Sequence, residues 1–109
     1  MPVDVLSRLA GPVNAASGDN TIFTPNEGHQ GWVRSIKVVN NTAAKVTIKV
    51  GINSSSDSSL IIPAVGVPAR GMIERQTFDI LEDDDSLIVN ASATGTTVTI
   101  NGFDRYPHL

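Results

Sequence analysis

The residues best suited to chemistry stand in one acidic run at positions 82–85, with the sequence EDDD, just before an apolar stretch. Neighbouring carboxylates can hold a divalent cation or act together as a general acid and base. A calcium loop, however, spaces its ligands and includes a glycine for a sharp bend, whereas consecutive acids point in different directions. Asp and Ser are favoured in turns because their side chains bond nearby backbone N–H groups. The run is therefore predicted to be a turn, and a cation shared with another loop or subunit is the alternative.

The other candidates for catalysis form no recognisable constellation. His29 and His108 are the only histidines, and no G-x-S-x-G motif or glycine-rich phosphate loop accompanies them. Both are expected to be solvated side chains. Trp32 and Tyr106 are the only Trp and Tyr, too few for the aromatic platforms of a sugar-cleaving groove. Trp32 is expected in the core, with sugar stacking as the alternative. The sequence predicts no enzymatic activity, no cofactor and no metal.

Composition narrows the class of partner. The chain has 109 residues, enough for one domain with its own core, and a net charge of −3. Charged residues make up only 17% of it, so Ser, Thr and Asn must supply much of the polar surface, which suits protein–protein packing. Lys and Arg are dispersed, which does not favour nucleic-acid binding. Without cysteine there is no disulfide or thiolate metal site, and the absence of a signal-peptide pattern or long apolar run predicts a soluble protein without membrane contact.

Alternating apolar residues dominate the chain from Thr21 onward. The segment AKVTIKVGIN is the clearest case, because every second residue from Val46 to Ile52 is apolar and the others are polar or glycine. The same rule places Trp32 and Ile36 together on one face of the strand GWVRSIKVVN, along with Val38.

Further strands follow the same pattern. In MIERQTFDI, the even-numbered Met72, Phe78 and Ile80 share a face. Six or seven short strands separated by turn signals, with no convincing long helix, predict an all-β fold: an antiparallel β-sandwich or jelly-roll-like single domain over residues 20–104.

The two ends of the chain are expected to lie outside this domain. Residues 1–19 are predicted to be an N-terminal arm, in which VDVLSRLAGP forms one or two helical turns before a small, polar, extended stretch. Residues 105–109 are predicted to be a C-terminal tail. The arm is either frayed or docks its apolar residues on a neighbouring subunit, with the tail as a second contact. The expected partner-contact residues are Val5, Leu6, Leu9, Tyr106, Pro107 and Leu109.

The order of the segments resembles a known family. TIFTPNEGHQGWVRSIKVVNNTAAKVTIKVGI and SLIIPAVGVPARGMIERQTFDILEDDDSLIVNASATGTTVTINGFD resemble small β-sandwich virion proteins of tailed bacteriophages. Those proteins share a strand ending in T-P, a glycine-containing loop, V-x-S-I-x-V-x-N, an alternating strand, an I-I-P segment, a strand ending in L-E-x-x-D-S-L and a final T-V-T-I-x-G. The match covers residues 20–104. In this layout residues 81–86 form the turn before the penultimate strand, where the family commonly has glycine in place of Asp84.

The resemblance implies a non-enzymatic structural protein of the virion. The expected function is that of a head decoration or cement protein, made in the host cytoplasm, which binds the major capsid protein or another virion protein and assembles as a homotrimer. A tail, collar or fibre module is the first alternative. A carbohydrate-binding β-sandwich module is the second, although aromatic residues are only 5% of the chain.

Overall fold

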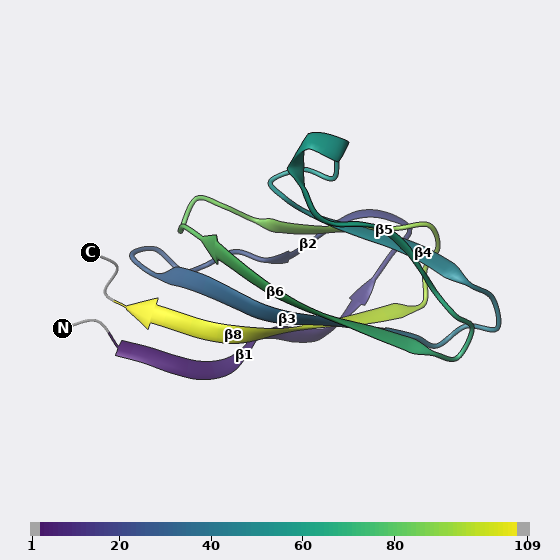
Figure 1. Cartoon of the computed structure of the whole chain (residues 1–109), viewed down its shortest axis with the longest axis horizontal. Helices are drawn as coiled ribbons and strands as arrows, with labels where there is room; N and C mark the ends of the chain where they lie inside the picture. The colour runs from purple at the N-terminus through teal and green to yellow at the C-terminus, as the bar shows by residue number, and fades with distance from the viewer. Residues whose placement is uncertain (1–2, 107–109) are drawn as a thin grey trace.

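The computed structural model describes the backbone of residues 3–106 and the side chains of residues 8–105. Its strands are β1 (Val3–Ala15), β2 (Gly18–Phe23), β3 (Gln30–Asn40), β4 (Val46–Ile52), β5 (Leu60–Val67), β6 (Met72–Leu81), β7 (Leu87–Ala91) and β8 (Thr96–Tyr106), with a 3₁₀ turn, η1 (Asp57–Ser59), before β5. They form two antiparallel four-stranded sheets packed face to face (Figure 1). The predicted all-β sandwich is confirmed.

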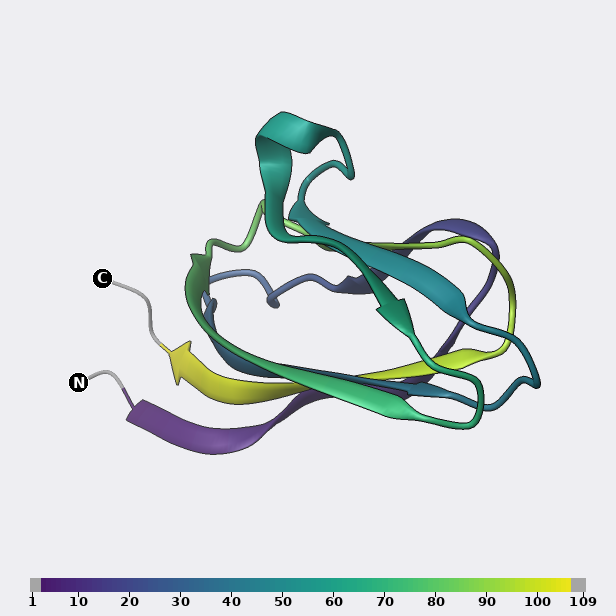
Figure 2. The same cartoon turned by 45° about the vertical axis from the view of Figure 1, so that its right-hand side comes forward.

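The strands pair as one long hairpin would: β1 with β8, β2 with β7, β3 with β6 and β4 with β5. The tip of this hairpin is the β4–β5 loop, which contains η1 and rises above the two layers in Figure 2. Rolling up the hairpin adds the pairs β3–β8 and β4–β7. The resulting strand orders, β1-β8-β3-β6 and β2-β7-β4-β5, are those of an eight-stranded jelly roll.

The inward residues of both sheets form one core. The alternation predicted for β4 holds, since Val46, Ile48 and Val50 are buried while Thr47 and Lys49 remain partly exposed. Alternation in SLIVNASA and TTVTINGFD predicts Leu87, Val89, Ala91, Ala93, Val98 and Ile100 to point inward; all of them are buried except Ala93, which is exposed after the end of β7. Each Val, Ile or Leu buried in this way contributes about 1.5–3 kcal/mol relative to exposure, so this layer holds the sheets together.

The predicted separation of residues 1–19 from the domain is wrong, and so is the helical turn. β1 pairs with β8 from Val3, opposite Tyr106, to Ala15, opposite Thr96. Without β1, strand β8 would expose a row of unpaired N–H and C=O groups at the sheet edge, so backbone pairing outweighs the local helical signal. The expected C-terminal tail likewise begins inside β8 rather than after it.

Asp19 on β2 ties the β4–β5 loop to the sheet below it. Its Oδ1 accepts hydrogen bonds from Asn90 Nδ2 at 2.8 Å and from Ser55 Oγ at 2.7 Å. These two bonds hold the pKa of Asp19 below its ordinary value; burial opposes them, and the charge of Lys49 adds the least to the lowering. The exposed tip of the hairpin is therefore anchored by an ionised carboxylate.

The stability of the protein is expected to depend on this carboxylate in a pH-dependent way. Because folding lowers the pKa of Asp19 below 3.8, the ionised form stabilises the folded state at neutral pH, and the contribution is lost as the pH falls through the lowered value. Asp19→Asn should be less stable than the wild type at neutral pH, with a difference that shrinks in acid. Urea unfolding at both pH values measures this.

Asp57→Asn is the control for this prediction. It removes a charge from the β4–β5 loop, which Asp19 anchors, without touching the bonds from Ser55 and Asn90 to Asp19. An Asp19→Asn difference of equal size at neutral and acid pH would contradict the explanation.

Candidate interaction surface

Large apolar side chains gather on the outside of the sheet β1-β8-β3-β6. Phe103 on β8, Trp32 on β3 and Ile80 on β6 stand directly opposite one another in the strand register. Phe78 lies nearby, with its ring centroid 6.0 Å from that of Trp32. Phe78 is 61% exposed and Ile80 is 43% exposed, which is unusual for such large apolar residues. Together these four residues form what is called here the outer patch.

The position of Trp32 corrects the predicted core. Strict alternation would place Trp32 inward with Ile36 and Val38, but in the structure Val33 is buried beside those two residues and Trp32 lies on the outer face, partly exposed. The prediction that Trp32 packs in the core is therefore wrong. The inward alternation of β3 slips by one residue between Val33 and Ile36.

A β-bulge causes this slip. Val33 stands opposite Gly102 on β8, and Ser35 stands opposite the very next residue, Asn101, so β3 has one extra residue there, Arg34. A bulge of this kind re-aims the side chains on either side of it. Here it turns the first part of β3 over, which sends the indole to the outside of the sheet.

Two guanidinium groups lie over the rings of the outer patch. Arg34 is 5.2 Å from the ring centroid of Phe78, and Arg105 is 5.2 Å from that of Trp32. The indole is also fixed at its edge, because Trp32 Nε1 donates to Gln30 Oε1 at 2.6 Å. Aromatic and arginine side chains held in one place are typical of the energetic centres of protein–protein interfaces. Sugar stacking needs open ring faces, and here an arginine lies over each ring.

The acidic run lies next to this surface and is a turn, as predicted. Asp85 N donates to Glu82 O at 3.0 Å, and Glu82 N donates to Asp85 Oδ2 at 3.0 Å. Asn53 Nδ2 reaches the other oxygen of Asp85 at 2.8 Å, and Glu82 Oε1 accepts from Gln30 Nε2 at 3.0 Å. These carboxylates are engaged with neighbouring amides. Among the described residues, no group of three His, Asp or Glu side chains could hold a metal ion.

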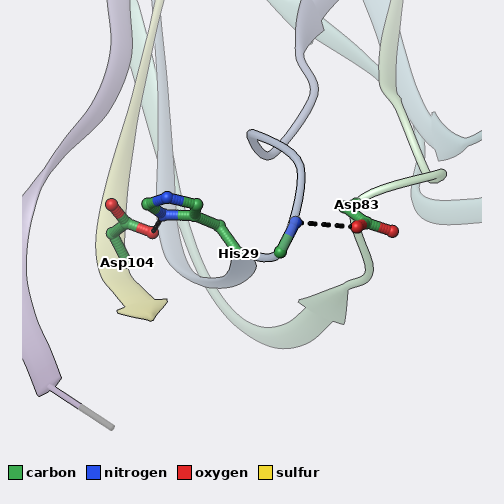
Figure 3. A network of polar contacts seen from close by, with 4 residues as sticks. His29, Asp83 and Asp104 are labelled. Carbon is green, nitrogen blue, oxygen red and sulfur yellow. Dashed lines mark hydrogen bonds and ion pairs between the residues drawn. The ribbon is translucent and has the colours of Figure 1, made fainter. Parts of the chain in front are cut away.

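Asp83 and His29 fasten the β2–β3 loop from its two sides, as Figure 3 shows. Asp83 Oδ2 accepts the backbone N–H of Gly28 at 2.9 Å, and His29 Nδ1 lies 2.8 Å from Asp104 Oδ1 on β8. The expectation that His29 is merely solvated is therefore wrong, while His108 lies outside the described residues. Asp83 makes none of the hydrogen bonds given above for the turn, but it has a structural partner in the β2–β3 loop.

Only some of the residues predicted to contact a partner have side chains in the described part of the chain. Leu9 packs against the core and lines an open cavity of about 310 Å³ between β1 and β2, so it is held within its own subunit, and its contact with a partner stays a prediction. Val5 and Leu6 belong to β1, where their backbones stand opposite Asp104 and Phe103. Tyr106 is the last residue of β8. The side chains of Val5, Leu6 and Tyr106, and all of Pro107 and Leu109, lie outside the described residues.

Sequence reasoning missed that the even-numbered face of β6 is the outer one. The signal for it is Leu81, an apolar residue at the strand end that occupies an odd position and is fully buried. Because side chains alternate along a strand, a buried Leu81 sends Phe78 and Ile80 outward. Glu74 and Gln76, on the same even face, point to the same conclusion.

Comparisons with known proteins give no assignment: no family model matches the chain, and no curated protein sequence matches it. Within residues 3–106, no helix has the length and apolar character needed to cross a membrane. The function is therefore argued from the outer patch itself.

Gly102 is expected to be indispensable for the bulge. A Cβ at this position would overlap the carbonyl oxygen of Trp32, so Gly102→Ala should lower the free energy of unfolding by about 1–3 kcal/mol. Gly66→Ala is the control, because its Cβ would meet only the flexible side chain of Lys45, and it should cost less than about 1 kcal/mol. Urea denaturation measures both, and equal losses would argue against the constraint.

The outer patch is also expected to add little to stability. Phe78→Ala should change the free energy of unfolding by no more than about 1 kcal/mol, because the ring is 61% exposed. Ile36→Ala, in the same sheet but 1% exposed, should cost about 2–5 kcal/mol. Thermal and urea unfolding of the two variants compare these losses. A large loss for Phe78→Ala would show that the ring is a core residue.

Proposed function

We propose that this chain is a non-enzymatic structural protein of a tailed-phage virion, a head decoration or cement protein that docks through the outer patch. The observation that carries the proposal is the group formed by the exposed Phe78 and Ile80 and the partly exposed Trp32 on one sheet face. The sequence resemblance supports the virion, and jelly rolls are frequent among capsid proteins. Because one fold hosts many functions, the outer patch is stronger support for this function than the fold is.

The chemistry of the patch suits the surface of another protein. Burying a side chain the size of Phe78 or Ile80 contributes about 1.5–3 kcal/mol. Arg34 adds a guanidinium group, which is suited to pairing with a carboxylate or stacking on a partner's side chain. A capsid lattice presents many copies of one site, so a contact of this size is sufficient for stable coverage of the head. The proposed partner is the major capsid protein or another virion protein.

Cosedimentation with heads and with tails, separated from virions of the phage that encodes the chain, tests this proposal. Wild-type protein should sediment with heads, and Phe78→Ser/Ile80→Ser should bind at least about tenfold more weakly, because each tenfold corresponds to about 1.4 kcal/mol. Thr21→Ser/Lys45→Ser changes an exposed residue of β2 and the exposed residue just before β4, both in the opposite layer, and should bind normally.

The outcomes of this experiment separate the candidates. Binding to tails alone would replace the decoration function by that of a tail, collar or fibre module. Binding to heads that the double substitution leaves unchanged would show that another surface makes the contact.

A carbohydrate-binding module is the second candidate, favoured by one observation: Trp32 lies on the outer face instead of in the core. Against it, Arg105 lies over the indole and Arg34 over the ring of Phe78. Selective glycan binding that Trp32→Ala abolishes, without any binding to heads or tails, would favour this candidate over the virion protein.

A further inference from the structure

Four strands lie at the edges of the two sheets, and three of them contain a proline or are short. β1 and β5 carry Pro12 and Pro63, each with two register shifts, and β2 is a strand of only six residues with one shift. These are the usual devices that keep an edge from pairing with another chain. β6 also has one register shift, against β3 between Val33 and Ser35, but its ten residues include neither proline nor glycine.

The side chains of β6 alternate without a break. Phe78 and Ile80 lie outside and Leu81 lies in the core. In the described part of the chain β3 is its only hydrogen-bonded neighbour, so its other side offers a row of backbone N–H and C=O groups. The edge is ten residues long, which is enough to accept another strand.

We infer that two copies of this chain pair through β6, antiparallel, about a two-fold axis perpendicular to the sheet. The β1-β8-β3-β6 sheets of the two copies then form one continuous sheet across the dimer. An axis in this direction keeps the outer faces of both copies on the same side, so facing residues must both be even-numbered or both odd-numbered. Two registers give the greatest overlap of the strand: one places Thr77 opposite itself, and the other places Gln76 opposite itself.

Charge complementarity selects the register with Thr77 at the axis. In that register Arg75 of each copy stands opposite Asp79 of the other, so the contact contains two equivalent ion pairs on the inner side of the sheet. Arg75 is exposed in the single chain and Asp79 is half-buried beside Thr77, which donates to its Oδ2. The charges of Arg75 and Asp79, which would lack partners on most other strands, are therefore paired by the opposite charges of a second copy.

The alternative register lacks this match. With Gln76 at the axis, Asp79 would face the apolar Ile73 and Arg75 would face Thr77, so neither charge gains a partner. On the outer side both registers place Glu74 opposite an apolar residue, Ile80 in the first and Phe78 in the second, and solvent reaches it there. The inner side therefore decides between the two.

The pairing has a consequence for the outer patch. Phe78 and Ile80 of both copies would lie on one face of the continuous sheet, so two patches would become one broad docking surface. The inference does not rest on the proposed function, because it concerns the isolated protein in solution. Loss of head binding would leave it standing, and a monomeric protein would leave the docking proposal standing.

Light scattering after size exclusion, repeated over a range of concentrations, tests the assembly. The expected result is a concentration-dependent mass that approaches twice 11.5 kDa. A two-fold strand pairing is closed, so a mass of three times 11.5 kDa would overturn the inference in favour of the trimer that the sequence resemblance implies. A monomer at every concentration would overturn it as well.

A charge-reversal cycle tests the register. Arg75→Asp and Asp79→Arg should each raise the dimer dissociation constant by about tenfold or more, because like charges then face each other. The double variant should return to within about threefold of the wild type, because the pairs are restored in reverse. Circular dichroism and urea unfolding check that each variant folds. Single variants that dimerise normally, or a double variant weaker than both, would overturn the register.

Disulfide cross-linking gives a second test that does not need the charges. The chain has no cysteine, so Thr77→Cys introduces a single thiol. At the axis it faces its own copy across about 4.5–5.5 Å between Cβ atoms, close to disulfide distance. Mild oxidation should give a covalent dimer for Thr77→Cys and little for Gln76→Cys or the exposed control Ser58→Cys. Equal yields, or a yield highest for Gln76→Cys, would overturn the inference.

Discussion

The single extra residue in β3, Arg34, is the constraint on which both the core and the outer surface depend. Because β3 lies between β8 and β6, its slip is imposed on both neighbours: Gly102 must lack a side chain on one side, and the register with β6 shifts on the other. The bulge lets Val33 and Ile36 both face the core. The same slip sends Trp32 outward, so core packing and the exposed indole have one cause.

The rest of the fold holds this arrangement in place from its ends. The nested pairs of the rolled hairpin bring the β2–β3 loop between β8 and the acidic turn, where Asp104 and Asp83 fasten it. At the start of β3, directly after that loop, Gln30 reaches Trp32 on one side and Glu82 on the other. The indole thus belongs to a polar network that begins in the acidic turn, and its position is set by contacts within the single chain.

Much of the fold could be predicted from the sequence because β4, β7 and β8 alternate strictly and their turns carry the expected residues. The turn at residues 82–85 was predictable for the same local reason. β1 was not, because its strand character comes from pairing with β8, more than 80 residues away in sequence at Val3 and Tyr106. The inversion of Trp32 was not either, since the glycine that permits the bulge stands on another strand. Contacts distant in sequence decided both.

The placement of the outer patch on a sheet changes how docking works. An arm that orders on binding costs about 1–2 kcal/mol of backbone entropy for each residue fixed, which must be offset by its contacts. Trp32 and Phe78 lie on strands already fixed by folding, and arginines over their rings restrict them further. A few side chains can then supply useful affinity where a frayed segment would need many. Because β1 completes the sheet by pairing with β8, the N-terminal segment would contribute to the proposed docking by supporting this face and not by contacting the partner itself.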